Sequence, residues 1–301
     1  MKILEVIVTY KPNLDLLMKS ILSTKNQVEK ILVIDNSDVN ESVFNGFLVP
    51  DNVEIKELHE NIGIAEATNI AIRYGIENNY DWILTSDQDT VYPEDYIENF
   101  IRNYEVLREG NNKIIGFSPV YFDRNTGVYG ELFEWNGQSI APIISEETNT
   151  KILAAIASGL IINLHLIEEV GLMNSDLFID WVDLDWCYRA YFLGYDLIGC
   201  KDLKISHCLG DTSKSLFGKQ ITLRNPLRHY YIIRNCEYLS LYELSYPKEF
   251  RDFLHKKVKT YLAGYFYLAK PHFKNLKYLI RGIKDAKNKR MGKCSLLGEK
   301  K

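Results

Sequence analysis

Two carboxylates follow an apolar segment, and their spacing suggests a site for a divalent cation. The segment Trp82–Leu84 runs on to Asp87 and Asp89, which are separated by Gln88. Residues two apart on a strand lie on the same face, so at a strand end both carboxylates can bind one hard cation such as Mg²⁺ or Mn²⁺. Such an ion bridges the phosphates of a nucleotide and neutralises a leaving diphosphate. Taken alone, the pair also fits two solvated acids at a turn.

Competing phosphate chemistries fit less well. An aspartyl-phosphate phosphatase carries a D-x-D-x-T motif, but here Thr90 comes one residue too early and Val91 occupies its place. The first strand–helix turn, residues 9–13, has no glycine to admit the pyrophosphate of a dinucleotide. The chain also lacks a G-x-x-x-x-G-K-[ST] loop, which argues against ATP or GTP hydrolysis.

A second acidic group lies among aromatic residues in the segment Phe178–Tyr188. It contains Asp180, Asp183 and Asp185. Because like charges raise the pKa of a carboxyl group, we expect Asp180 and Asp185 to raise the pKa of Asp183, which suits a base that works near neutral pH. The alternative is the acidic start of an amphipathic helix, where carboxylates interact favourably with the helix dipole.

The first 120 residues alternate between two hydrophobic periods, which predicts a mainly parallel sheet covered by helices on both faces. Apolar runs typical of buried strands occupy Ile3–Val8, Ile31–Ile34, Val53–Leu58, Trp82–Leu84 and Ile114–Phe117. Segments of helical period separate them: Leu14–Leu22, Ala65–Ile76 and Tyr96–Leu107. Ligands of such sheets bind beyond the carboxyl ends of the strands, which selects Thr9-Tyr10, Asp35-Asn36, Asn61-Ile62-Gly63 and Asp87-Gln88-Asp89.

The rest of the chain is organised differently. Polar and turn residues prevail over residues 127–150, and we expect a strand over Ala154–Ile162 and a helix over Leu164–Val170. Residues 248–301 look helical and carry 16 Lys and Arg against 4 Asp and Glu, whereas the preceding residues have a net charge of −16. The acidic body argues against nucleic-acid binding, and the basic segment suggests an anionic partner.

Composition points to a soluble globular chain, with 46% hydrophobic and 25% charged residues. The amino terminus runs directly into a strand-like segment, so we expect no signal peptide, and no apolar run approaches the ~20 residues of a membrane-spanning helix. The five cysteines form no C-x-x-C pair, as expected of reduced thiols in the cytoplasm. A zinc site from Cys200, His207 and Cys208 fits no tetrahedral pattern and lacks a fourth ligand.

The four groups at the predicted strand ends, together with Asn69, occur in the order and spacing typical of one enzyme family. In this respect the chain resembles the inverting family-2 glycosyltransferases of the GT-A fold, over roughly residues 1–240. The resemblance implies an α/β, GT-A fold: a mainly parallel, Rossmann-like sheet flanked by helices, with a helical basic C-terminal extension. It implies a glycosyltransferase domain over residues 1–240, with a nucleotide-binding half, 1–120, and an acceptor or catalytic half, 121–240. The segment 241–301 follows.

The same resemblance implies roles for individual residues. Contacts with the nucleoside are implied for Thr9, Tyr10, Asp35 and Asn36. A wall near the ribose and diphosphate is implied for Asn61, Gly63 and Asn69. The implied ligands of Mg²⁺ or Mn²⁺ are Asp89, as the principal carboxylate, Asp87, which also lies near the ribose, and His207 in the segment Ile205–Asp211.

The acidic motif is similar to the family segment that holds the general base, which implies that role for Asp183. The family usually has Glu where this chain has Asp185, a departure that shortens the side chain by one methylene. The resemblance also implies substrate contacts for Asp185, Trp186 and Arg189.

Two details resemble the bacterial rhamnosyltransferases of polysaccharide assembly: the Asp-Gln-Asp motif and the basic-aromatic segment Pro226–Asn235. The resemblance implies that Arg228, Tyr231 and Arg234 reach the diphosphate or the acceptor; a surface helix with solvated arginines is the alternative. The implied donor is dTDP-β-L-rhamnose, and the implied acceptor is a saccharide or lipid-linked saccharide. A UDP-hexose or furanose donor, a Mg²⁺-dependent phosphatase with Asp87 as nucleophile, and a non-catalytic sugar-nucleotide-binding protein are the rival hypotheses.

The basic C-terminal segment has an apolar stripe at helical spacing. The stripe consists of Leu276, Leu279, Ile280 and Ile283, and lysines and an arginine supply most of the opposite flank. Such a helix is typical of an element that lies on an anionic membrane, here the inner face of the cell membrane. The alternative is packing on the domain or on a second subunit in a homo-oligomer. None of the catalytic motifs lies beyond Tyr246.

Overall fold

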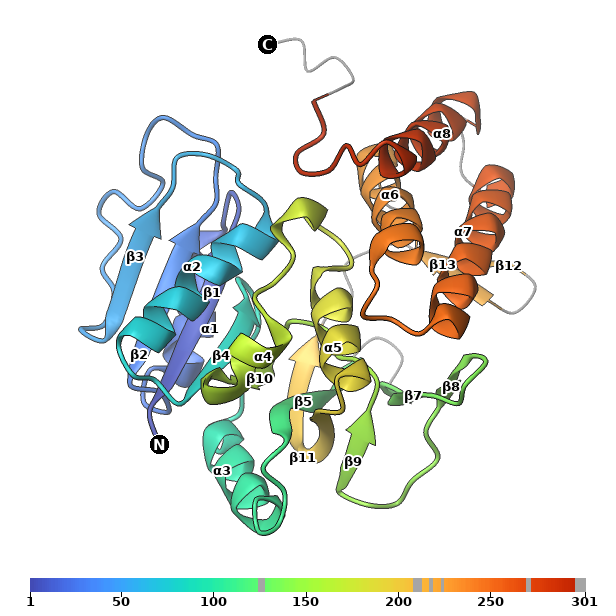
Figure 1. Ribbon diagram of the computed structural model, residues 1–301. Helices are drawn as coiled ribbons and strands as arrows, with labels where there is room; N and C mark the ends of the chain where they lie inside the picture. The colour runs from blue at the N-terminus through green and yellow to red at the C-terminus, as the bar shows by residue number, and fades with distance from the viewer. Residues whose placement is uncertain (124–127, 208–212, 217–218, 223–224, 269–271, 296–301) are drawn as a thin grey trace.

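The computed structural model describes residues 1–295 except 124–127, 208–212, 217–218, 223–224 and 269–271. Its centre is a nine-stranded mixed sheet (Figure 1). Four strands form the parallel part, in the order β3 (Val53–Glu57), β2 (Lys30–Asp35), β1 (Ile3–Thr9) and β4 (Trp82–Asp87). The predicted α/β fold with a mainly parallel sheet flanked by helices is confirmed.

The sheet continues past β4 with strands of both directions. Antiparallel β10 (Leu160–Asn163) separates β4 from β5 (Ile114–Asp123). Next come β11 (Asp196–His207), which is parallel to β5, and antiparallel β9 (Asn149–Ile152). Three further pairings complete the set: β6 (Val128–Tyr129) with β5, β7 (Phe133–Trp135) with β8 (Ile140–Pro142), and β12 (Ser213–Leu216) with β13 (Lys219–Thr222).

Helices cover both faces of the parallel strands because successive strand residues point to opposite sides. Along β1, Leu4 and Val6 belong to the core cluster that includes α2 (Ile64–Glu77). Ile3 and Ile7 belong to the cluster with α1 (Leu14–Thr24) and α3 (Tyr96–Leu107). Two-sided burial explains why these strands read as continuous apolar runs.

The strand predicted over Ala154–Ile162 is wrong in its first half, because only β10, from Leu160, is extended. The preceding loop leaves the sheet because its backbone is bonded elsewhere: the Ala157 N–H donates to the Asp183 carboxylate, and the Ala157 carbonyl accepts from the Thr85 hydroxyl. The predicted helix that follows is split into a 3-10 turn, Leu164–Leu166, and the short α4, Ile167–Val170.

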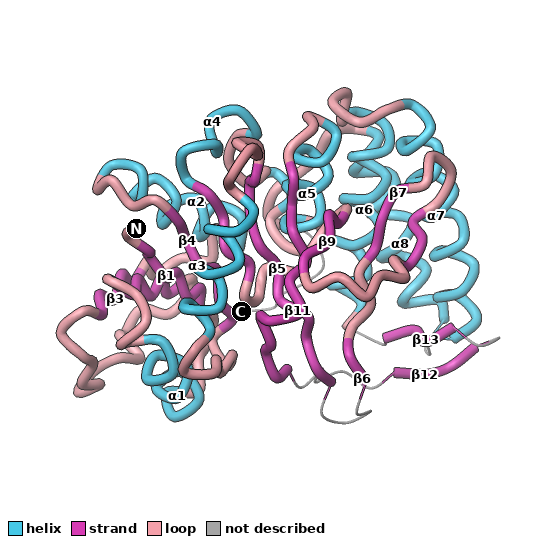
Figure 2. The backbone as a smooth tube through the Cα atoms, turned by 90° about the horizontal axis from the view of Figure 1, so that it is seen from below, coloured by secondary structure: helices cyan, strands magenta, loops and turns pink. Residues whose placement is uncertain are grey.

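The C-terminal half adds four longer helices, α5 (Val182–Phe192), α6 (Pro226–Tyr242), α7 (Lys248–Leu268) and α8 (His272–Lys287), besides a 3-10 turn at Ser175–Leu177. Figure 2 shows α6, α7 and α8 side by side, at the end of the molecule away from β3. The expected boundary at residue 240 falls inside α6. Core packing continues across that boundary, since Phe250 and Leu254 of α7 belong to the same cluster as Trp186 of α5.

The apolar stripe of α8 packs largely against the protein. Leu279 is fully buried, Ile283 packs on the core cluster, and Ile280 is 54% exposed. This packing favours the second sequence-based interpretation, in which the stripe covers the domain and the lysines face water. No helix within the described ranges is long and apolar enough to cross a membrane.

Because α7 completes the core, the Phe250→Ala substitution should destabilise the whole domain. Phe250 is 0% exposed and its ring packs edge-on against Tyr188 of α5 and Trp135 of β7. We expect a loss of about 3–5 kcal/mol in the free energy of unfolding, measured in urea. The matched control, Leu244→Ala, alters a side chain that is 76% exposed and should change it by less than ~0.5 kcal/mol. An unchanged main transition in Phe250→Ala would instead identify residues 241–301 as a separate unit.

Candidate active site

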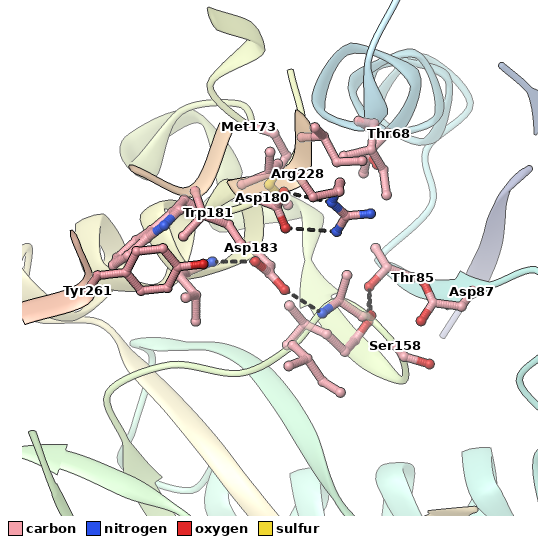
Figure 3. Close-up of a pocket in the computed structure, with 18 of the residues that line it drawn as sticks. Thr68, Thr85, Asp87, Ser158, Met173, Asp180, Trp181, Asp183, Arg228 and Tyr261 are labelled. Atoms are coloured by element: carbon pink, nitrogen blue, oxygen red, sulfur yellow. Dashed lines mark hydrogen bonds and ion pairs between the residues drawn. The ribbon is translucent and has the colours of Figure 1, made fainter. Parts of the chain in front are cut away.

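A cavity of about 870 Å³ lies where β4, α5, α6 and α7 meet. Three of the residues selected from the sequence line it: Asp87 at the end of β4, Asp183 in the first turn of α5, and Arg228 in the first turn of α6. Figure 3 shows Asp183 between Asp87 on one side and Tyr261 of α7 on the other. The two acidic motifs, about a hundred residues apart in the sequence, therefore face one space.

The Asp183 carboxylate is held by two backbone donors. The Leu184 N–H donates to Oδ1 at 2.8 Å and the Ala157 N–H donates to Oδ2 at 3.1 Å. Burial, and to a smaller extent the negative charge of Asp87, nevertheless raise the pKa of Asp183 to about 6. The raised pKa agrees with the sequence-based expectation, but its principal cause is burial and not repulsion by Asp180 and Asp185.

Asp180 and Asp185 are each bonded to an arginine. Asp180 accepts a bidentate pair of bonds from Arg228, from Nε and Nη2, both at 2.8 Å. Asp185 is fully buried; it accepts from Arg189 Nε at 3.1 Å and from the Tyr246 hydroxyl at 2.6 Å. The positive charges of the two arginines offset the negative charges of Asp180 and Asp185, which weakens the repulsion that either carboxylate exerts on Asp183.

Asp185, Trp186 and Arg189, for which the resemblance implies substrate contacts, do not line this cavity; their side chains are bonded within the protein. Trp186 is buried in the core and donates from Nε1 to the Gly171 carbonyl at 3.0 Å. Arg189 donates to the carbonyls of Val170 and, at 2.8 Å, Leu172. Trp186 and Arg189 therefore fix α5 to the end of α4 and the residues that follow it, and Asp185 ties α5 to Tyr246 beyond α6. These bonds position the helix that carries Asp183.

Tyr231 and Arg234 also make their contacts within the protein. Arg234 is fully buried and donates to the carbonyls of Leu177, at 2.9 Å, and Gly292, at 2.6 Å. The ring of Tyr231 stacks on Phe178, with 5.3 Å between ring centroids, and its hydroxyl accepts from the Cys294 N–H. Of the three residues expected to reach the diphosphate or the acceptor, only Arg228 lines the cavity.

Asn235 was not selected from the sequence, yet it holds the loop before α5. Its buried Nδ2 lies within hydrogen-bond distance of three carbonyl oxygens, those of Leu177 (3.0 Å), Ile179 (2.9 Å) and Asp180 (2.8 Å). The same loop contains three non-glycine residues with positive φ, Phe178, Asp180 and Trp181. Such conformations persist only where surrounding contacts hold them, and an asparagine inside an aromatic helix gives no pattern that would reveal this role.

Gly63 and Asn69 contact the same loop from α2. Gly63 has φ +90°, and a Cβ there would lie 2.6 Å from the Phe178 ring and 2.7 Å from its carbonyl oxygen. Asn69 exchanges two bonds with the backbone of Met173, both at 2.9 Å. In the structure both residues therefore contact the segment between α4 and α5, Gly63 at Phe178 and Asn69 at Met173.

The ends of β1 and β2 form a polar cluster. Thr9 and Asp35 are register partners, and the buried Asp35 Oδ1 accepts from the Thr9 hydroxyl at 2.7 Å and the Ser37 hydroxyl at 2.8 Å. Asn36 donates to Asn61 Oδ1 at 3.1 Å. These four predicted residues are thus brought together at the carboxyl edge of the sheet, where α/β proteins bind nucleotides.

The Asp-Gln-Asp turn is tied to its neighbours on both sides. The backbone N–H of Tyr10, whose side chain is largely exposed, donates to Gln88 Oε1 at 3.0 Å. Thr90 bonds Ser158 through their hydroxyl groups at 2.7 Å. Asp87 is partly buried against the cavity, whereas Asp89 is exposed in the turn.

The implied metal ligands are only partly described. No group of three or more His, Cys, Asp or Glu side chains able to hold a metal ion occurs in the described part of the chain. His207 is the last residue of β11, but its side chain lies outside the described residues. Of the three implied ligands, Asp87 and Asp89 have described side chains, and their carboxylates are hard oxygen donors next to solvent. Such donors suit Mg²⁺ or Mn²⁺ because these ions keep several waters or carboxylates as ligands.

Comparison with known proteins identifies the class of enzyme. A family model described as Glycosyl transferase family 2 matches residues 6–170. The chain is 34% identical over 234 residues to the dTDP-rhamnosyl transferase RfbF of Shigella flexneri, which covers 77% of each protein. It is 24% identical over 192 residues to the low-salt glycan biosynthesis hexosyltransferase Agl10 of Haloferax volcanii, covering 62% of this chain and 60% of that protein. The chain belongs to glycosyl transferase family 2.

Solved structures agree in fold. A crystal structure of GalNAc-T7 with UDP, GalNAc and Mn²⁺ aligns with a TM-score of 0.61 at 14% identity, covering 96% of this chain and 56% of that one. Residues 1–349 of S. aureus TarS align with a TM-score of 0.59 at 13% identity, covering 96% and 82%. At these identities the likeness concerns the fold alone, and it extends over nearly the whole chain.

Because burial raises the pKa of Asp183 to about 6, glycosyl transfer should depend on pH. The protonated carboxyl cannot accept a proton, so kcat/KM, which reports the pKa of the free enzyme, should fall about tenfold per pH unit below about 6 and level off above it. The measurement is kcat/KM over this range, with circular dichroism to verify that the protein stays folded. A flat profile in folded protein would contradict the assignment of Asp183 as a titrating base.

Proposed function

We propose that this glycosyltransferase moves L-rhamnose from dTDP-β-L-rhamnose to a hydroxyl group of a saccharide or lipid-linked saccharide, with inversion of the anomeric configuration. The main support for this reaction is that Asp87, on the sheet side, and Asp183, whose pKa is raised, line the same cavity. The 34% identity to a dTDP-rhamnosyl transferase supports the donor. The proposed setting is bacterial polysaccharide assembly, in the cytoplasm or at the inner face of the cell membrane.

The proposed catalytic step follows from the position of Asp183. Its carboxylate accepts the proton of the acceptor hydroxyl as that oxygen attacks the anomeric carbon, and the bond from this carbon to the diphosphate oxygen breaks. Because attack comes from the face opposite the leaving group, a β-linked donor gives an α-linked product. The backbone donors of Ala157 and Leu184 fix the carboxylate in place before the substrates bind.

The proposed donor site is the carboxyl edge of β1, β2 and β4. Thr9, Asp35, Asn36 and Asn61 surround the nucleoside in this proposal, with the Tyr10 side chain available on the exposed side. Asp87 and Asp89, with His207 as the third ligand, hold Mg²⁺ or Mn²⁺. When bound there, the cation neutralises the negative charge of the departing diphosphate.

The donor and the metal can be tested together by calorimetry. We expect wild-type protein to bind dTDP-rhamnose in preference to UDP-glucose and UDP-galactose, and to do so with Mn²⁺ but not in excess EDTA. Asp89→Ala should weaken the Mn²⁺-dependent binding at least about tenfold. The matched control is Asp95→Ala, which removes an exposed carboxylate six residues away and should leave binding unchanged.

Two results would count against this assignment. Preferential binding of a UDP-sugar would show that the donor belongs to the rival class of nucleotide sugars. Donor binding that does not depend on a metal ion would refute the proposed metal site. Hydrolysis of a simple phosphate ester by wild type but not by Asp87→Asn would indicate the phosphatase chemistry instead.

The base is tested by Asp183→Asn, which keeps the shape of the side chain but cannot accept the proton. Turnover should fall by ~10²–10⁴-fold while donor binding is retained. Asp176→Asn makes the same change of charge on an exposed loop residue and serves as the control. Near-normal transfer by Asp183→Asn at saturating acceptor would show that another group takes the proton.

A further inference from the structure

The side of the cavity away from Asp87 is walled by α7, a helix outside the residues matched by the family model. Thr260, Tyr261 and Tyr265 of α7 line it, together with Trp181 at the start of α5. We propose that this aromatic wall is the acceptor subsite, and that it binds a pyranose ring of a saccharide with one hydroxyl directed at Asp183. The inference rests on the proposed function and names the part of the chain that selects the acceptor.

The position of the base between two dissimilar walls supports this division. Figure 3 places Asp87 and Thr85 on one side of Asp183, and Tyr261 and Trp181 on the other. In an inverting transfer the leaving group and the attacking hydroxyl lie on opposite faces of the anomeric carbon, and the base must contact the attacking hydroxyl. With the diphosphate near Asp87, the attacking hydroxyl belongs on the α7 side.

The chemistry of this wall suits a sugar ring. A pyranose has apolar C–H faces and polar edges, and aromatic side chains with a polar tip offer a matching combination. The rings of Tyr261 and Tyr265 lie nearly parallel, at 11°, with centroids 6.1 Å apart. The Tyr261 hydroxyl bonds the buried His229 ring, which fixes the orientation of the tyrosine.

Backbone strain at Trp181 is the second observation. Trp181 has φ +69°, a left-handed conformation that a bulky residue rarely adopts. It is the N-cap of α5 but provides no side-chain capping bond, so capping does not explain the residue type. The conformation places a large ring on the cavity wall two residues before the base, and Asn235 and the Asp180–Arg228 pair hold the adjoining backbone. Strain maintained in this way is typical of a residue with a binding role.

A steric block tests the subsite without touching the core. Thr260 is exposed yet lines the cavity, so Thr260→Trp should fill the acceptor side. Lys259→Trp places the same ring on the neighbouring exposed residue, which does not line the cavity, and is the matched control. The probes are methyl α-L-rhamnopyranoside, methyl β-D-glucopyranoside and methyl N-acetyl-β-D-glucosaminide, added with dTDP and Mn²⁺, with binding followed by saturation-transfer NMR.

We expect wild type and Lys259→Trp to bind at least one of the pyranosides. Thr260→Trp should bind the same pyranoside with an affinity at least tenfold lower, and its binding of dTDP-rhamnose should be unchanged. A second pair examines the ring itself: Tyr261→Ala should raise the KM for the same pyranoside about tenfold or more, and Tyr261→Phe, which keeps the ring, should restore it. If Tyr261→Ala is unstable in thermal unfolding, the Thr260 pair decides.

Each failure has a distinct signature. Pyranoside binding that survives Thr260→Trp, or the absence of pyranoside binding in wild type that still binds dTDP-rhamnose, would overturn the acceptor subsite alone. Absence of donor binding in wild type would instead refute the proposed function on which the subsite rests.

Discussion

The contact between the amide of Asn235 and the loop before α5 is the constraint on which the catalytic side of the molecule depends. An amide nitrogen has two hydrogens, so with three carbonyl oxygens within 3.0 Å at least one hydrogen is shared. Of the bonded carbonyls, one belongs to Asp180, which has positive φ, and the other two belong to Leu177 and Ile179, which flank Phe178, another residue with positive φ. Because the amide is buried, water cannot replace a lost bond, and leaving these carbonyls unpaired would lower the free energy of unfolding.

The loop held by Asn235 determines the position of Asp183, because Asp183 lies in the first turn of the helix that follows this loop. Helix α5 starts without a side-chain cap, so the direction in which its first turn points is set by the loop and by the buried contacts of Asp185, Trp186 and Arg189. Gly63 lets the backbone of α2 approach the same loop, since any side chain there would overlap Phe178. The start of α2 and the loop before α5 therefore meet at backbone distance, and the separation of Asp87 from Asp183 is determined by packing across that contact.

Much of the fold was predictable because the buried strands carry their own signal. Runs such as Ile31–Ile34 have no competing interpretation when both faces of a sheet are covered, and the helix Tyr96–Leu107 was predicted with its observed ends. The places of Thr9, Asp35 and Asp87 at one edge of the sheet were predictable because each residue ends a strand. The surroundings of a polar side chain were harder to predict. Arg228 and Arg234 lie on the same helix, α6, yet Arg234 is buried against carbonyls and Arg228 lines the cavity. Sequence spacing does not decide which carbonyls a side chain will reach.

The contribution of α7 to the cavity has a consequence for how the enzyme is made. The strands of the donor half pair within the first ninety residues of the chain, so much of that half can form early in synthesis. Asp183 cannot reach its final surroundings until α7 has been translated, because Phe250 packs on α5, and Tyr261 and Tyr265 complete the cavity. A nascent chain therefore has the carboxyl edge of β1, β2 and β4 before it has the far wall of the cavity. Premature termination anywhere before residue 265 leaves a protein with Asp87 and Asp183 but without the enclosure that they face.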